Sequence, residues 1–380
     1  MLPSIFSLLT LFLHFQFAPS YCFTLFLFGD SLVDAGNNNY LFTLSKADSP
    51  PYGIDFTPSG GRPTGRFTNG RTIADIVGEG VGAKSFPQPY LGPNSAANAF
   101  NIGINYASGA SGILDATGTL FIGRLPLNEQ ISNFARTREY VVNVVGENNT
   151  SNLLKDAIFS VAIGSNDVIN YFQQSIPFLG GAVSPAVFQD FMVSNLTMQL
   201  KRLHSLGARK LVVVGLGPLG CIPFIRAINL IPTGQCSAAV NAFATAYNLR
   251  LKHELHDMNL HLGLMLSLST PIPTTFSLKS SPTIVTMIIT EADGIFALPA
   301  GFENSDGPCC GGYVPPFFCY KGKDASTTSA LCDDRKAYVF WDAYHPTEAA
   351  NLIVAQRLLD GDTSYCSPIN IRQLYHHDFT

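Results

Sequence analysis

Short apolar runs alternate along the chain with longer segments of helical periodicity. Four runs have the length and the β-branched or aromatic content of buried strands: Thr24–Phe28, Ile102–Tyr106, Ala157–Ile163 and Lys210–Val214. Apolar residues recur at helical spacing in later segments, and we expect helices over Phe188–Leu206, Ser237–Met258 and Pro346–Leu359. Strands that alternate with helices are typical of βαβ units, so the pattern predicts an α/β fold with a mainly parallel sheet.

The composition favours one large globular domain. Of the 380 residues, 46% are hydrophobic and 13% are charged, well below the roughly 25% that is usual in soluble domains. A disordered chain has the opposite balance. The net charge is −4 and no basic run occurs, which argues against a nucleic-acid-binding protein. No shift in composition marks a second domain, so we expect a single domain over residues 24–366, followed by a C-terminal tail at 367–380.

The N-terminus predicts export. The first 28 residues carry no charged side chain, and Ile5–Phe15 is an apolar core of signal-peptide length. Small residues at Ala18 and Ser20 favour cleavage between about residues 20 and 23, so we interpret residues 1–20 as a signal peptide. The alternative is a membrane anchor, because Ile5–Phe28 is long enough to span a bilayer. We favour cleavage, since the end of this segment is needed as the first strand, and expect no stable membrane anchor.

Cysteine usage also predicts a secreted protein. The chain has eight cysteines and no CxxC pair, which argues against a zinc ribbon: Cys22, Cys221, Cys236, Cys309, Cys310, Cys319, Cys332 and Cys366. The four between 309 and 332 are expected to cross-link a long loop, with a connectivity that the spacing leaves open. Three N-glycosylation sequons, at Asn148, Asn149 and Asn195, agree with an extracellular location.

Polar residues follow the predicted strands at the edge of the sheet where α/β proteins bind ligands. Ser31 follows the first strand, Gly109 the second and Asn166 the third, and Asp342 precedes His345 by three residues. These are the parts of acyl transfer: a nucleophile, amide donors for an oxyanion, a base and a carboxylate that orients it. Taken singly, each has an ordinary explanation as a helix cap, a turn glycine with positive φ, an Asx-turn or a capping pair. Their joint order favours a catalytic site.

The blocks around these residues resemble those of plant GDSL-type esterase/lipases, within the SGNH hydrolase superfamily. The similar blocks follow the family's order and include Gly29-Asp30-Ser31-Leu32, Pro63-Thr64-Gly65-Arg66-Phe67, Asn105-Tyr106-Ala107-Ser108-Gly109, Gly164-Ser165-Asn166-Asp167 and Asp342-Ala343-Tyr344-His345-Pro346. The resemblance covers most of the chain and implies a flavodoxin-like three-layer α/β/α sandwich with about five strands. No GxSxG motif occurs, so an α/β-hydrolase nucleophile elbow is not supported.

The resemblance implies a role for each candidate residue. Ser31 is expected to be the nucleophile and to donate its backbone N–H to the oxyanion, together with the N–H of Gly109 and the side-chain amide of Asn166. His345 is expected to be the general base, oriented by Asp342. This Ser-His-Asp mechanism needs no metal ion and no organic cofactor. We therefore expect a secreted ester hydrolase whose partner is a small-molecule or lipid ester, or an acylated polysaccharide.

Two other functions fit the same residues. An acyltransferase uses the same site when an alcohol other than water intercepts the acyl-enzyme. A catalytically silent extracellular protein could bind lipid or glycan through the same cleft. We favour the hydrolase, because the nucleophile, the base, its carboxylate and the oxyanion donors are all present.

Residues 259–300 depart from the family pattern. Ser269–Pro282 contains three prolines and many Ser and Thr residues, which oppose a regular helix and a central strand. The segment is either a genuine divergent loop or the product of a shifted reading frame or mis-assigned exon. We favour the second, because both flanks match the family. If the segment is genuine, we expect the edge of the sheet to be incomplete.

Overall fold

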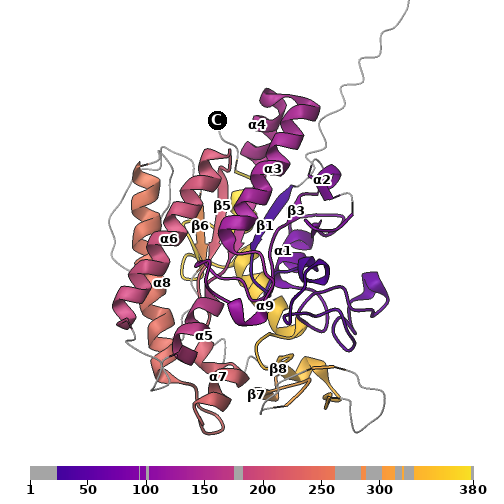
Figure 1. Ribbon diagram of the computed structural model, residues 1–380, viewed down its shortest axis with the longest axis vertical. Coiled ribbons are helices and arrows are strands. Elements are labelled where there is room, and N and C mark those ends of the chain that lie inside the picture. Colours follow the sequence, from indigo (N-terminus) through magenta and orange to yellow (C-terminus); the bar gives the residue numbers. More distant parts are fainter. Residues whose placement is uncertain are drawn as a thin grey trace, which may run out of the picture.

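The computed structural model describes residues 24–93, 95–99, 102–174, 183–261, 284–287, 302–312, 319–320 and 329–377 (Figure 1). The predicted signal peptide at 1–20 lies outside these residues. Most of the divergent segment, at 262–283 and 288–300, lies outside them as well.

A parallel sheet forms the centre of the molecule (Figure 1). Its five central strands lie in the spatial order β3 (Ile104–Asn105), β1 (Leu25–Gly29), β4 (Ile158–Ala162), β5 (Lys210–Val214) and β6 (Ile284–Met287). The short strand β2 (Gln88–Pro89) extends one edge in parallel, and β9 (Cys366–Ser367) pairs antiparallel with β6 at the other. The α/β fold with a mainly parallel sheet is confirmed.

Strand β6 falls within the segment that departs from the family pattern. Its backbone pairs with β5 from Leu211 opposite Ile284 to Val214 opposite Met287. The expectation of an incomplete edge was therefore wrong, because four residues downstream of the last proline of Ser269–Pro282 continue the parallel order.

Helices cover both faces of the sheet, because successive side chains of a strand point to opposite sides. Phe26 and Phe28 of β1 pack toward one group of helices, and Leu25 and Leu27 pack toward the other. The first group consists of α3 (Leu127–Val145), α4 (Glu147–Asp156), α5 (Ser165–Gln174), α6 (Pro185–Ser205) and α8 (Ala238–His261). The second group consists of α1 (Ile73–Gly80), α9 (Glu348–Asp360) and α10 (Ile371–Tyr375). The layers therefore stack as helices, sheet and helices, as the resemblance implied.

The remaining elements are short. Helices α2 (Ser95–Asn98) and α7 (Pro223–Ile228) lie in connections, and β7 (Asn304–Pro308) pairs in parallel with β8 (Tyr338–Phe340) in a separate two-stranded sheet. Within the described part of the chain, no helix is long and apolar enough to cross a membrane.

The last helix of the prediction begins later than expected. Thr347 is the N-cap of α9, and its side chain accepts a hydrogen bond from the backbone N–H of Ala350. Pro346 therefore lies before the helix, where it bridges to Phe340, rather than in the first turn. The threonine hydroxyl satisfies an amide at the helix start that proline cannot, which sets the boundary.

The end of the chain packs onto the domain. Ile371 and Leu374 of α10 are buried among the apolar side chains of α1 and α9. Residues 366–375, which include part of the expected tail, thus contribute to the core beneath the sheet.

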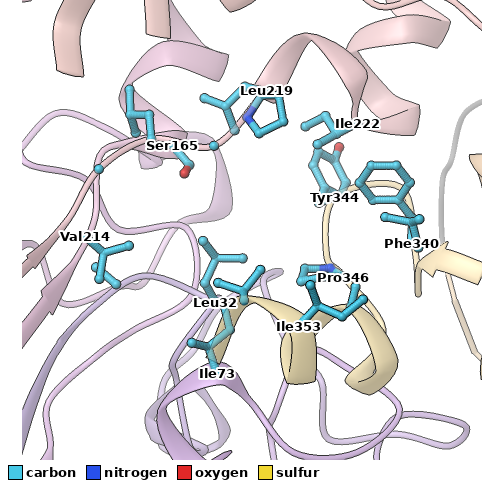
Figure 2. A pocket seen from close by; sticks show the side chains of 18 of the residues that line it. Leu32, Ile73, Ser165, Val214, Leu219, Ile222, Phe340, Tyr344, Pro346 and Ile353 are labelled. Atoms are coloured by element: carbon cyan, nitrogen blue, oxygen red, sulfur yellow. The ribbon is translucent and has the colours of Figure 1, made fainter. Parts of the chain in front are cut away.

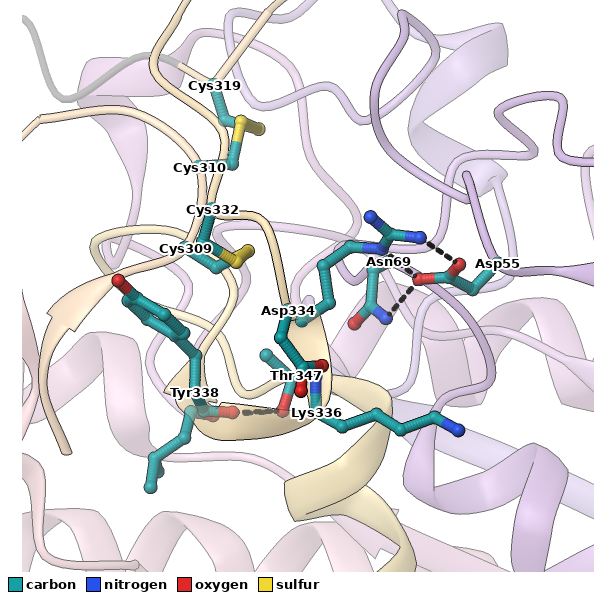
Figure 3. Close-up of a disulfide and its surroundings, with 12 residues drawn as sticks. Asp55, Asn69, Cys309, Cys310, Cys319, Cys332, Asp334, Lys336, Tyr338 and Thr347 are labelled. Carbon is teal, nitrogen blue, oxygen red and sulfur yellow. Dashed lines mark hydrogen bonds and ion pairs between the residues drawn. A yellow bond between two sulfur atoms is a disulfide. The ribbon is translucent and has the colours of Figure 1, made fainter. Parts of the chain in front are cut away.

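Three disulfides cross-link the described residues: Cys221–Cys236, Cys309–Cys332 and Cys310–Cys319. The last two join the loop that links β7 to β8, as the clustering of four cysteines indicated (Figure 3). Cys366 is a free thiol, and burial raises its pKa to about 12, so it stays protonated.

Candidate active site

Ser31, His345 and Asp342 form one hydrogen-bonded chain. The Ser31 Oγ lies 2.7 Å from His345 Nε2, although 314 positions separate the two residues. The His345 Nδ1 lies 2.8 Å from each carboxylate oxygen of Asp342. Ser31 is half-buried, and the imidazole and the carboxylate are buried. A hydroxyl, an imidazole and a carboxylate in this order can transfer a proton away from the hydroxyl.

The position of Ser31 depends on the turn that ends β1. A Cβ at Gly29 would collide with the carbonyl oxygen of Ala162 in β4, so only glycine allows this approach. The side chain of Gln130 in α3 accepts from the Gly29 N–H at 2.9 Å and donates to the Gly29 carbonyl at 2.8 Å. Gln130 is fully buried and was not among the residues predicted from the sequence. It holds the turn that presents the serine.

Asp342 and His345 lie in the loop between β8 and α9. Asp342 Oδ1 accepts the backbone N–H groups of Tyr344 and His345, each at 2.8 Å. The pair therefore sits in a turn closed by the aspartate side chain, between β8 and the start of α9. This turn places the His345 imidazole beside the Asp342 carboxylate.

Tyr52 is a further member of the site that sequence reasoning missed. Its hydroxyl donates a 2.7 Å hydrogen bond to Asp342 Oδ2. Burial raises the pKa of Asp342, but the charge of His345 and the hydrogen bonds from His345, Tyr344 and Tyr52 outweigh it and hold the pKa below its usual value. Burial and the neighbouring carboxylate raise the pKa of Tyr52 well above its ordinary value, so it remains a donor. The carboxylate is thus ionised and fixed.

Two of the three expected oxyanion donors are available. The backbone N–H of Ser31 makes no hydrogen bond to any residue that the structure describes. Asn166, in the first turn of α5, donates one side-chain N–H to the Ser111 carbonyl at 2.9 Å, which leaves its second N–H unused. The N–H of Gly109, in contrast, donates to Asp34 Oδ2 at 3.0 Å. The role implied for Gly109 therefore conflicts with the structure, because a buried carboxylate already holds that amide.

Three buried carboxyl groups surround the strand ends. Burial raises the pKa of Asp30 to about 7, and the pKa values of Asp34 and Asp167 to about 6. Asp167 accepts from the backbone N–H groups of Ile113 and Leu114, which shapes the loop after β3. Burial makes the ionised form of each of these carboxyl groups unfavourable in the folded protein.

We expect the protein to be more stable at pH 5 than at pH 8. The folded-state pKa of Asp30, about 7, lies above its ordinary value of 3.8, so the folded protein binds more protons than the unfolded chain between these values. Stability therefore falls as the pH rises through this window. Asp342 acts in the opposite sense, since its lowered pKa contributes stability that is lost only as the pH falls below about 4.

Thermal unfolding followed by circular dichroism checks this. The Tm should be higher at pH 5, by about 2 °C or less for each 1 kcal/mol of linked stability, because this domain is larger than the 150–250 residues for which about 1 kcal/mol shifts the Tm by about 2–4 °C. Asp30→Asn should reduce this pH dependence without removing it, because Asp34 and Asp167 still titrate. A higher Tm at pH 8 would contradict the assignment.

Two cavities flank the catalytic residues. The polar cavity, of about 210 Å³, is lined by residues that include Lys46, Tyr52, Ala110, Asn166, Cys319 and His345. The apolar cavity, of about 150 Å³, is lined almost entirely by carbon, with Leu32, Ile73, Val214, Ile222, Phe340 and Ile353 around it (Figure 2). Leu32 directly follows Ser31, and Ile169 and Tyr344 border both cavities. His345 thus lines the polar cavity, and Leu32, the neighbour of Ser31 in the sequence, lines the apolar one.

Among the residues that the structure describes, no group of three or more His, Cys, Asp or Glu could hold a metal ion.

Comparison with known proteins gives consistent matches. A model of the family described as "GDSL-like Lipase/Acylhydrolase" matches residues 25–358. GDSL esterase/lipase At5g41890 of Arabidopsis thaliana is 60% identical over 353 residues, which cover 93% of each chain. GDSL esterase/lipase At4g16230 of the same plant is 47% identical over 92% of this chain and 90% of its own. The similarity extends across nearly all of the domain.

Proposed function

This chain belongs to the GDSL-like lipase/acylhydrolase family and is a carboxylic ester hydrolase, and on that premise we propose that it is a secreted serine esterase acting through Ser31, His345 and Asp342. The observation that carries the proposal is the hydrogen-bonded chain from the carboxylate through the imidazole to the serine hydroxyl. These hydrogen bonds join residues from opposite ends of the sequence, whereas a turn or a helix cap needs only neighbouring residues.

The mechanism proceeds through an acyl-enzyme. His345 Nε2 takes the Ser31 proton as Oγ attacks the ester carbonyl carbon, and the ionised Asp342 stabilises the imidazolium. The tetrahedral oxyanion accepts hydrogen bonds from the Ser31 N–H and the Asn166 amide. The imidazolium then gives its proton to the departing alcohol as the C–O bond breaks. A water molecule repeats the sequence on the acyl-enzyme and releases the acid.

The apolar cavity supports an acyl chain as the preferred acyl group. It begins at Leu32, beside the nucleophile, and offers almost no polar surface, so an acetylated sugar gains little there. An apolar cavity near 150 Å³ accommodates a molecule of about benzene size, which corresponds to roughly six carbons. The polar cavity, with Lys46 and Tyr52, suits the alcohol portion. We therefore place a lipid-like ester with a medium-length chain ahead of an acetylated polysaccharide.

Hydrolysis of p-nitrophenyl esters of graded acyl length tests this assignment. We expect kcat/KM to rise from acetate to hexanoate by about fourfold per methylene, since each buried CH₂ contributes about 0.8 kcal/mol. Gly217 lines the apolar cavity, and a Cβ there would meet no atom within 4 Å. Gly217→Phe should therefore enter the cavity and lower kcat/KM for hexanoate tenfold or more, with acetate changed less than twofold.

The acetate ester is the internal control for folding and for the catalytic residues. An equal loss on acetate and hexanoate, or no loss on either, would show that this cavity does not hold the acyl chain. Absence of hydrolysis across the whole series would instead support the catalytically silent alternative and refute the esterase.

Export is supported by the three disulfides, which form in oxidising compartments. Among the sequons, Asn148 and Asn149 are exposed in α4, whereas Asn195 is half-buried in α6. We propose the first two as the more accessible glycosylation positions.

A further inference from the structure

In the turn after β3, the backbone N–H of Gly109 donates to a buried carboxylate, whereas the N–H of Ala110 has no acceptor among the described residues. Asp34 is fully buried, and its carboxylate accepts the backbone N–H groups of Gly36, Asn37 and Gly109 at 2.7, 2.8 and 3.0 Å. The Gly109 N–H is therefore directed at this carboxylate. An amide so engaged does not face a developing oxyanion, because one N–H makes one strong hydrogen bond.

Gly109 is required for a steric reason instead. Its φ is not in the left-handed region, and a Cβ there would lie 2.6 Å from the Phe67 ring and 2.8 Å from Ser45 Oγ. The Phe67 ring packs against the His345 imidazole, with 5.0 Å between the ring centroids. Glycine at 109 thus allows the backbone to approach the wall of the catalytic site.

The next amide, that of Ala110, is unpaired. It makes no hydrogen bond to any part of the chain that the structure describes, although Ala110 is only 4% exposed. Buried backbone N–H groups are almost always paired, so an orphan of this kind calls for a partner. The Gly109 carbonyl accepts from Asn38 Nδ2 at 3.0 Å. Because C=O and N–H of a planar trans peptide point in opposite directions, the Ala110 N–H points away from Asn38.

The backbone at Ala110 is also strained. Its φ is 67°, in the left-handed region, which is unfavourable for an alanine. Strain at single residues collects at functional sites, where surrounding structure enforces it. Ala110 lines the polar cavity together with Asn166 and His345, so the strained residue lies at the site itself.

We propose that the backbone N–H of Ala110, and not that of Gly109, is the third hydrogen-bond donor to the oxyanion. It joins the Ser31 N–H, which likewise has no partner among the described residues, and the free N–H of the Asn166 amide. This proposal rests on the esterase function above and extends it to one specific atom. Alanine is sufficient at this position, because the backbone amide and not the side chain acts on the substrate.

Replacing a single N–H by an ester oxygen tests the assignment. Lactic acid in place of Ala110, introduced by nonsense suppression, keeps the methyl group and the backbone shape and removes only the N–H. We expect kcat for p-nitrophenyl hexanoate to fall by about 10²- to 10³-fold, the effect of one oxyanion donor. The Tm should change little, because the deleted N–H has no partner among the residues that the structure describes. Asn38→Ala removes the hydrogen bond to the Gly109 carbonyl together with those to Ser45 and Ser108, so it gives an upper limit for the effect of the weaker ester carbonyl.

Glycolic acid in place of Gly109 is the matched control. It removes the hydrogen bond to Asp34, so we expect a lower Tm with kcat reduced less than tenfold. A large loss of kcat at 109 with activity retained at 110 would overturn the proposal and leave the esterase intact. No ester hydrolysis by the wild-type protein would overturn both.

A structure of the enzyme after reaction with a fluorophosphonate provides an independent readout. The phosphoryl oxygen stands in for the oxyanion and should lie about 2.7–3.1 Å from the Ala110 nitrogen. A phosphoryl oxygen at that distance from the Gly109 nitrogen instead would contradict the proposal.

Discussion

Replacement of Ser31 by alanine is expected to lower kcat for ester hydrolysis by on the order of 10⁴- to 10⁶-fold. In the proposed mechanism the hydroxyl is the attacking group, and its removal leaves His345 with no proton to accept. The fold should survive, since Ser31 Oγ makes its hydrogen bond to the imidazole alone among the described groups and the residue is half-buried. Kinetics on p-nitrophenyl hexanoate and a Tm measurement check both parts.

Labelling by a fluorophosphonate probe gives a second readout for the same substitution, because the probe modifies only an activated serine. Wild-type protein should be labelled once and Ser31→Ala not at all. Ser165 follows β4 as Ser31 follows β1, but no imidazole of the described residues is hydrogen-bonded to it, so Ser165→Ala should remain labelled. Labelling of Ser31→Ala at the wild-type level would show that another serine is the nucleophile.

The second large effect is expected from Asp342→Asn, which should lower kcat at neutral pH by on the order of 10⁴-fold. The asparagine amide keeps the size of the side chain but cannot both accept from the loop N–H groups and hold the His345 ring in the tautomer that receives the serine proton. Substrate binding should change much less, because Asp342 lies behind the imidazole. Steady-state kinetics separates kcat from KM.

Tyr52→Phe is the graded companion of that variant. It removes one hydrogen bond to the carboxylate and leaves the charge in place, so we expect a loss in kcat of about tenfold or less. If Asp342→Asn retained activity within tenfold of the wild type, the carboxylate would not be part of the catalytic chain. Equal losses in the two variants would assign the effect to the position of the loop rather than to the charge.

Local pattern was sufficient for the strands and for the residues at their ends. Lys210–Val214 is the observed β5, and the predicted strands around Leu25 and Ile158 are correct to within one or two residues at each end. A buried parallel strand is a continuous apolar run, so its signal lies within a few neighbouring residues. Helix starts were less well predicted. Thr347 caps α9 after Pro346, and Ser184 caps α6 with Pro185 in its first turn, before the expected start at Phe188.

Side chains that act across the fold could not be found in this way. Tyr52 lies 290 positions from Asp342 in a Pro/Gly-rich stretch, and Gln130 lies on a helix 101 positions from the glycine that it holds. Neither has a local motif that sets it apart from other buried polar residues. Their partners become visible only when distant segments meet.

The sequence alone established the order of apolar strands, the polar residues that follow them, and the clustering of cysteines that form the cross-linked loop. These features are local, since a hydrophobic run and the turn after it involve neighbouring residues. The tertiary structure decided which groups meet: Ser31 with His345, Tyr52 with Asp342, β6 with β5, and the pairing of each cysteine. It also decided that the Gly109 amide turns to Asp34 and that the Ala110 amide has no acceptor among the described residues, because the direction of an N–H depends on packing between segments far apart in the chain.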